Sequence, residues 1–299
     1  MVRYLMLLTT VLLCGCQQAS EDTVSSEPAP AAAEAPASNS LAAFLDAQPD
    51  DVKVRYQYRH PQQTLQFFGI EPGMTVVEGL PGRGWYTKLL LNYLGSDGCL
   101  IGANYSMEMW PLFSFASEEF LAGQATWGEA FKSDAEGWGG DNAATLEAFY
   151  FGSMPESFAG TVDVVFFPRV LHNLANFQNA GEGEFLAKAL ADVYAVLKPG
   201  GLFGVVQHRA RDNMSDEFAN GTHGYLKRDW IVEQIERAGF EFVAESDINE
   251  NERDRPTEDE VVWRLPPSYN GAGDDAELMA ALDAIGESHR MTLKFRKPE

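Results

Sequence analysis

The sequence predicts an α/β fold, a mostly parallel sheet with helices on both faces. Short apolar runs alternate with segments of helical periodicity through most of the chain, and glycine or proline turns separate several of them. Parallel strands require crossover connections, most often helices, so this alternation is typical of such a sheet. A chain of 299 residues with 45% apolar residues also has enough material to bury a large core.

The first half of the domain is expected to begin with a helical region, followed by a strand, a helix and a second strand. Residues 51–68 have helical character in two pieces, broken near Pro61 because proline lacks an amide donor and disfavours helix in the preceding residue. The apolar run 74–78 follows a Pro-Gly turn and predicts a buried strand. Residues 85–94 predict a helix, and the run 99–103, bounded by glycines, predicts the second strand.

The middle of the chain carries weaker signals. Residues 104–146 show no clear periodicity. Residues 148–151 are a candidate third strand, and the apolar run 161–167 predicts a buried fourth strand. The insertion after the second strand contains an aromatic set that either lines an acceptor pocket or builds a satellite core: Tyr105, Trp110, Phe113, Phe115 and Trp127.

The second half is regular. Residues 184–197 carry apolar side chains at helical spacing, and the Pro-Gly-Gly turn within 198–201 predicts where this helix ends. The run 202–206 predicts a fifth strand, 227–238 a helix and 240–244 a further strand. These elements continue the alternation that the parallel sheet requires.

A glycine-rich loop, Glu78–Gly84, lies between the first strand and the helix after it. Glycine lets backbone N–H groups approach a ligand closely, and the helix N-terminus beyond the loop favours polar or anionic groups. In open α/β sheets, ligands bind at the carboxyl ends of the strands, where this loop is expected to lie. Many α/β turns need glycine for geometry alone, so the loop by itself is a weak signal.

The loop resembles the first motif of the class I S-adenosylmethionine-dependent methyltransferases. That motif has an acid at the strand end and glycines four and six residues later, which are Glu78, Gly82 and Gly84 in this chain. Leu80 replaces the usual glycine two residues after the acid. The resemblance extends to the fourth-strand motif at 158–165 and to the Leu-Lys-Pro-Gly-Gly turn before strand five.

More narrowly, the chain looks like a group of predicted bacterial methyltransferases. The segments that carry this likeness are 59–61, 68–74, 82–87 and 289–295. The resemblance covers about residues 50–299. It implies a Rossmann-like class I methyltransferase sandwich, with a mostly parallel sheet of seven strands, and a methyltransferase that acts on a small-molecule acceptor.

The resemblance also implies a cofactor, S-adenosyl-L-methionine. Its methionine part would lie in the glycine loop, at Gly82 and Gly84, with Glu78 contacting the ammonium group directly or through water. Asn104 stands where an acid normally binds the ribose hydroxyls, and amide hydrogen bonds lack the charge assistance of a carboxylate. Ser153 stands in the third-strand motif, which often supplies an acid for the adenine amine.

Three residues after the fourth and fifth strands are candidates for the reaction site. Arg169 is expected to contact the cofactor. Methyl transfer is an in-line displacement, so a base is needed only if the acceptor must lose a proton. His172 is the candidate general base and His208 a candidate substrate contact; each could instead serve a structural hydrogen bond.

The composition of the chain limits the kinds of ligand that it is expected to bind. The net charge of −22 disfavours nucleic acid, because binding to phosphates draws its affinity from lysine and arginine. The five histidines show no ligand spacing with cysteines, so we predict no metal site. A small-molecule substrate is the expected partner.

The N-terminus predicts export. Arg3 precedes a short apolar stretch, 4–13, which is shorter than the roughly 20 residues that a membrane-spanning helix needs and matches a secretory signal. Leu13-Cys14-Gly15-Cys16 resembles the lipobox of bacterial lipoproteins, which implies lipidation of Cys16. The alternative is an ordinary signal peptide with an incidental cysteine.

We therefore expect three parts: a lipoprotein signal peptide at 1–15, a disordered tether rich in Ala, Pro, Ser and Glu at 16–40, and a methyltransferase-like domain at 41–299. The expected location is the bacterial cell envelope, lipid-anchored and facing the periplasm. By resemblance to sorting rules, Gln17 favours the outer membrane over the inner one.

Export and cofactor supply conflict, since S-adenosylmethionine is made in the cytosol. An alternative hypothesis is therefore a non-catalytic exported binding or assembly protein that retains the fold. Asn104 and Ser153 favour this alternative, whereas Glu78 and the two loop glycines favour the enzyme. A dinucleotide oxidoreductase is disfavoured, because the loop glycines lack the spacing of its fingerprint.

Overall fold

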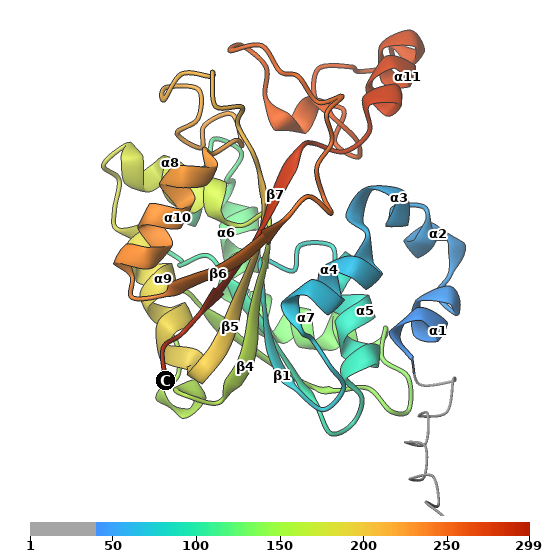
Figure 1. Cartoon of the computed structure of the whole chain (residues 1–299), viewed down its shortest axis with the longest axis vertical. Helices are drawn as coiled ribbons and strands as arrows, with labels where there is room; N and C mark the ends of the chain where they lie inside the picture. Colours follow the sequence, from blue (N-terminus) through green and yellow to red (C-terminus); the bar gives the residue numbers. More distant parts are fainter. Residues whose placement is uncertain (1–39) are drawn as a thin grey trace, which may run out of the picture.

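The computed structural model describes residues 40–299 (Figure 1). The predicted signal peptide, the predicted lipidation site Cys16 and nearly all of the predicted tether lie outside the described residues. Within residues 40–299, no helix has the length and apolarity needed to cross a membrane.

A seven-stranded sheet of order β3-β2-β1-β4-β5-β7-β6 forms the centre of the domain. The strands β1 to β5 pair in parallel, and β7 runs antiparallel to its neighbours β5 and β6. This is the strand order of the class I methyltransferase sheet, so the predicted fold class is confirmed. The strands are β1 (Thr75–Gly79), β2 (Cys99–Asn104), β3 (Thr145–Tyr150), β4 (Val162–Pro168), β5 (Leu197–His208), β6 (Glu241–Ser246) and β7 (Arg290–Arg296).

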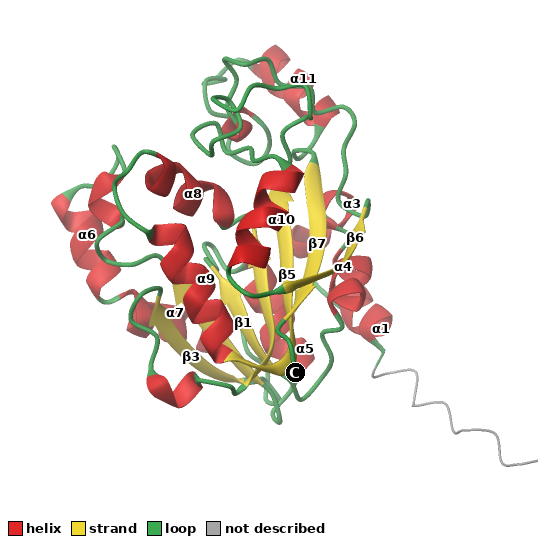
Figure 2. Ribbon diagram, turned by 60° about the vertical axis from the view of Figure 1, so that its left-hand side comes forward, coloured by secondary structure: helices red, strands yellow, loops and turns green. Residues whose placement is uncertain are grey.

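Helices cover both faces of this sheet (Figure 1, Figure 2). The face with α8, α9 and α10 forms one apolar core, and the face with α1, α4, α5 and α7 forms a second. Val76 and Val77, adjacent in β1, point into different cores, as alternation along a strand requires. The helices are α1 (Leu41–Asp46), α2 (Asp50–Lys53), α3 (Tyr56–Arg59), α4 (Pro61–Phe68), α5 (Trp85–Leu94), α6 (Glu118–Ala125), α7 (Trp127–Glu136), α8 (Leu171–Asn179), α9 (Phe185–Val196), α10 (Arg228–Arg237) and α11 (Ala276–Ile285).

Two local predictions need correction. The predicted turn at 198–201 is instead the first part of β5, because Leu197 already pairs with Val162 and the register shifts before the next pair. Gly200 takes the positive φ of 74° within this irregular pairing. The helical region before β1 has a second break between α2 and α3, besides the predicted one at the proline.

The connection between β6 and β7 extends beyond the carboxyl ends of the parallel strands and carries α11 (Figure 1). His208 at the end of β5 pairs with Arg290 at the start of β7. This antiparallel pairing brings the last residues of the connection, Glu287 and Ser288, to the edge of the sheet where β1 and β4 end.

Candidate functional site

A cavity of about 300 Å³ lies at the carboxyl ends of β1, β4 and β5. The glycine loop after β1 forms one wall, and the connection before β7 forms another. It contains two acids, several arginines and both candidate histidines. The residues that matter for its chemistry are Arg55, Arg59, Glu78, Arg169, His172, His208, Glu287 and Ser288.

Glu78 is buried near the end of β1 with one side-chain partner. Thr87 Oγ1 donates a hydrogen bond of 2.7 Å to Glu78 Oε2. Burial raises the pKa of Glu78 to about 7, against the opposing influences of Thr87, Arg59 and Arg169. A cationic ligand group beside this carboxylate would favour its charged form.

The two motif glycines have different roles in the structure. Gly84 has a φ of 75°, and a Cβ placed there would lie 2.3 Å from the Trp138 ring, so packing alone requires glycine. Gly82 has a φ of 59°, and a Cβ there would meet no atom closer than 3.7 Å. Gly82 lies on the wall of the cavity, whereas Gly84 does not line it.

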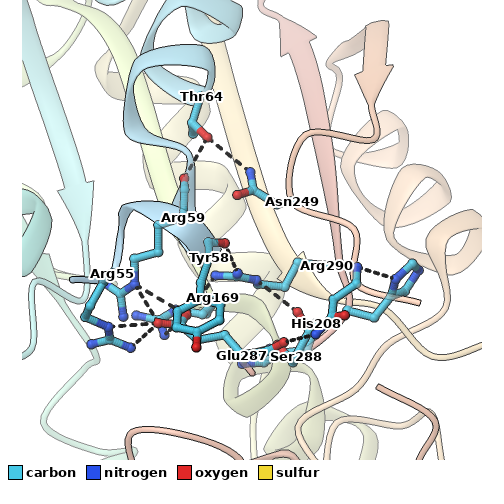
Figure 3. A network of polar contacts seen from close by, with 12 residues as sticks. Arg55, Tyr58, Arg59, Thr64, Arg169, His208, Asn249, Glu287, Ser288 and Arg290 are labelled. Carbon is cyan, nitrogen blue, oxygen red and sulfur yellow. Dashed lines mark hydrogen bonds and ion pairs between the residues drawn. The ribbon is translucent and has the colours of Figure 1, made fainter. Parts of the chain in front are cut away.

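Four arginines surround the buried carboxylate of Glu287, as Figure 3 shows. Arg55 Nε and Arg59 Nε donate to Glu287 Oε1 at 2.8 and 3.2 Å. Arg290 Nη1 donates to Oε2 at 3.1 Å, and Arg169 Nη1 lies 4.0 Å from the same oxygen. We call this group the arginine cluster.

The electrostatics of the arginine cluster follow from its charges. Burial alone would raise the pKa of Glu287, but the four guanidinium groups lower it to about 2. Burial also lowers the pKa of Arg59 to about 9. The cluster therefore places four cations around one ionised carboxylate, in a chain whose net charge is −22.

Of the residues in the arginine cluster, the sequence motifs indicated a functional role only for Arg169. Arg59 and Arg290 did lie in segments that carried the resemblance to bacterial methyltransferases. Arg290 is only three residues from Glu287 in the chain, whereas Arg59 and Glu287 are 228 residues apart. Only the fold brings these charges together.

The two candidate histidines lie next to each other, with ring centroids 5.5 Å apart. His172 Nδ1 lies 3.3 Å from the Nε2 and 3.5 Å from the Oε1 of Gln207. Burial lowers the pKa of His172 to about 4, and burial together with His172 lowers that of His208 well below its ordinary value. His208 Nδ1 contacts Ser288 Oγ at 2.5 Å. Both rings are therefore neutral at pH 7.

A second cavity, of about 730 Å³, adjoins the first. We call it the aromatic chamber. Leu80, Gly82, Arg169, His172 and Trp263 line both cavities. The aromatic set predicted after β2 contributes four of its five members to the wall, so the acceptor-pocket interpretation is compatible with the structure. The aromatic residues of the chamber are Tyr105, Trp110, Phe113, Phe115, Phe177 and Trp263.

Asn104 and Ser153, the two departures from the family motif, lie in different surroundings. Asn104 is buried at the end of β2, where Nδ2 donates to Gln124 Oε1 at 3.1 Å and Oδ1 accepts from Tyr105 N at 2.8 Å. It lines a third cavity, of about 320 Å³, together with Gly82 and several aromatic residues. Ser153 is exposed in the turn after β3 and lines none of the three cavities described above.

One cluster in the described residues has the spacing of a metal site, although the sequence predicted none. Single ligand atoms of Glu250, Glu252 and His289 lie within 4.8 Å of one another. Both carboxylates are already paired, Glu250 with Arg209 at 3.1 Å and Glu252 with Arg211 at 3.2 Å. Each of these ion pairs engages one oxygen of its carboxylate.

Neither a family model nor a curated protein matches this sequence. Among solved structures, a S-adenosylmethionine-dependent methyltransferase from Aquifex aeolicus is similar at 18% identity, with 68% of this chain and 93% of that chain covered and a TM-score of 0.43. The YcgJ protein from Bacillus subtilis is similar at 14% identity, with coverages of 79% and 97% and a TM-score of 0.44. An arsenic(III) S-adenosylmethionine methyltransferase from Chlamydomonas reinhardtii is similar at 16% identity, with coverages of 87% and 73% and a TM-score of 0.39. At these identities the likeness concerns the fold alone.

Proposed function

We propose that this chain is an S-adenosylmethionine-dependent methyltransferase that acts on a small-molecule acceptor. The observation that carries the proposal is the position of Glu78 and Gly82 on one cavity with the arginine cluster, at the carboxyl ends of the strands. The buried carboxylate suits an ammonium group and the arginines suit a carboxylate. The methionine part of the cofactor carries both groups.

The third cavity, which Asn104 lines, suits the remainder of the cofactor. Asn104 keeps one amide hydrogen and one oxygen lone pair beyond its two protein contacts, which allows hydrogen bonds to ribose hydroxyls. Aromatic walls suit a purine ring, which stacks on or packs against such side chains. The aromatic residues of this cavity are Trp110, Phe115, Phe120 and Trp127.

The residues of the chain would mainly bind and orient. When bound, the cofactor supplies a methyl group activated by its sulfonium. Glu78 would bind the ammonium group, and Arg59, whose charge acts on Glu78, would bind the carboxylate beside it. His172 Nδ1 faces Gln207, which leaves Nε2 as the atom that would take a proton from an acceptor. A base with a pKa of about 4 serves an acidic acceptor better than an alcohol.

We also propose that Cys16 carries a lipid anchor and that the domain faces the periplasm from the bacterial envelope. Support for this comes from the lipobox resemblance at residues 13–16 alone. A Cys16→Ser variant should lose palmitate labelling and move from the membrane fraction to the soluble fraction. Unchanged membrane partition of that variant would refute the anchor.

A second function remains as the alternative, a non-catalytic binding or assembly protein. The observation that favours it is that Asn104, which stands where the family motif has an acid, lacks a carboxylate's charge and bonds Gln124 and Tyr105 instead. Such a protein would keep the cavities without methyl transfer.

Calorimetric titration of the full-length protein with S-adenosylmethionine and S-adenosylhomocysteine separates the two functions. We expect micromolar binding that weakens at least tenfold in Glu78→Gln. Glu147→Gln is the matched control, since Glu147 is a surface residue of β3 paired with Lys132. Absence of binding to a folded wild-type protein would favour the non-catalytic alternative.

A further inference from the structure

Arg169 has an unusual backbone conformation at the carboxyl end of β4. Its φ of 71° lies in the left-handed region, which few residues other than glycine adopt. Its backbone N–H donates to Val206 O at 2.6 Å, which ties this conformation to β5. Strained residues of this kind cluster at ligand sites, where they hold a side chain in a fixed position.

The guanidinium of Arg169 is the least engaged of the arginine cluster. Arg55, Arg59 and Arg290 each donate hydrogen bonds to Glu287, whereas Arg169 reaches it only at 4.0 Å. Among the described residues, no hydrogen bond from the guanidinium of Arg169 is present. Its side chain is 28% exposed, so most of its five N–H donors are free toward the cavities.

Arg169 also lies where the two main cavities meet. It lines the cavity that holds Glu78 and the aromatic chamber as well. A ligand in the aromatic chamber would therefore meet a cationic, planar donor at the end nearest His172 and Trp263. The rest of its wall carries aromatic residues, Tyr105, Phe113 and Phe177 among them, together with polar residues such as Asn173 and Asn176.

The site would keep a net positive charge after the cofactor has bound. Four guanidiniums face the ionised Glu287, and Glu78 contributes at most one further negative charge. The cofactor contributes one carboxylate but also an ammonium and a sulfonium, so cations remain in excess when it binds. Buried charges without partners are costly, which favours a second ligand that carries an anion.

We infer that the methyl acceptor is a predominantly apolar molecule with a carboxylate, whose body occupies the aromatic chamber while Arg169 binds the carboxylate. This inference rests on the proposed function and reassigns Arg169 from the cofactor to the acceptor. Arginine matches carboxylates with two parallel hydrogen bonds, which a lysine cannot reproduce. The rival source of the anion is the carboxylate of the cofactor itself.

The test compares 2-naphthylacetate with its neutral amide, titrated into the full-length protein saturated with S-adenosylhomocysteine. The wild type should bind the acid at least tenfold more tightly than the amide. In Arg169→Asn this preference should vanish, and in Arg169→Lys it should be reduced. Asparagine tolerates the left-handed backbone, so this variant removes the cation without new strain. Arg237→Met, which changes an exposed arginine of α10, should leave the preference intact.

Two results would overturn the inference. One is equal affinity of the wild type for acid and amide. The other is a tenfold loss of S-adenosylhomocysteine affinity in Arg169→Asn with unchanged affinity for 5′-methylthioadenosine, which lacks the amino-acid part; the anion of Arg169 would then be the cofactor's own. Failure of the proposed function is separately visible: the wild type would bind no S-adenosylhomocysteine, and the acid–amide comparison, repeated without that ligand, would still report on Arg169.

Discussion

Two carboxylates line the same cavity, and both are almost completely buried, yet burial leaves them in opposite states. Glu78, behind the glycine loop, has a pKa raised to about 7 because its burial outweighs the opposing influences of Thr87, Arg59 and Arg169. Glu287, within the arginine cluster, has a pKa lowered to about 2 because four guanidiniums outweigh its burial.

The difference shows that partners, rather than depth, set the charge of a buried acid. It also assigns the two sides of the cavity to different ligand groups. The side of Glu78 gains from a cation, because a cation would repay the desolvation of its charged form. The side of Glu287 already has excess cations and gains from an anion. A cavity with these two preferences complements a zwitterion such as an amino-acid group.

The largest effect is expected from removal of the negative charge within the arginine cluster. Glu287→Gln leaves four guanidiniums facing one another, and breaking a buried pair typically lowers the free energy of unfolding by about 3–5 kcal/mol. Urea denaturation measures this loss. Glu233→Gln is the control, because its partner Arg237 is exposed and such pairs contribute about 1 kcal/mol or less. A loss below about 1 kcal/mol in Glu287→Gln would contradict the paired state of this carboxylate.

Glu78 and Glu287 should make the stability of the protein depend on pH in opposite directions. Its folded pKa of about 7 lies above the ordinary value of 4.5, so the folded state holds a proton that the unfolded state releases between these values. Stability is therefore lost as the pH rises from 4.5 to 7, by up to about 3 kcal/mol. Glu287, with its lowered pKa, instead loses stability as the pH falls from 4.5 to 2.

Unfolding of Glu78→Gln between pH 4.5 and 8.5 checks this prediction. The variant carries no titrating group at this position, so it should be more stable than the wild type at pH 8 and lose cofactor affinity at the same time. Equal pH profiles of the two proteins would show that Glu78 is ionised at neutral pH. In the wild type, affinity for the cofactor should rise as the pH increases through 7.

Within the loop, the two glycines separate packing from ligand contact. Gly84→Ala should destabilise by about 2 kcal/mol, because its Cβ would overlap the Trp138 ring. Gly82→Ala should cost only about 1 kcal/mol, for the positive φ, but should weaken cofactor binding the more strongly of the two. Thermal unfolding and calorimetry of both variants measure the two effects. The reverse order of affinities would show that Gly82 does not face the cofactor.

The sequence predicted most of the fold because its signals are local. Helix α5 begins and ends at the predicted residues, since Gly84 and Gly95 bound an apolar face. The helices α1, α6, α7, α8 and α11 were not predicted. Helix α6 buries none of its residues, so no apolar periodicity marks it. The motif also indicated Glu78 and Gly82, and both line the cavity that contains Glu287. The arginine cluster could not be predicted in the same way, because Arg55 and Glu287 lie 232 residues apart.

The smallest expected effect concerns Asn104, which lines the cavity proposed to hold the nucleoside part of the cofactor. Asn104→Asp can still accept from Tyr105 N, and Gln124 can rotate its amide to donate to the new carboxylate. If Asn104 contacts the ribose, charge assistance should strengthen binding of S-adenosylhomocysteine about fivefold, which corresponds to about 1 kcal/mol. Calorimetry measures the change, and binding of 5′-methylthioadenosine, which retains the ribose, should strengthen equally. Unchanged affinity for both ligands would remove Asn104 from the site, and with it the main argument that the cavity of Trp127 holds the nucleoside.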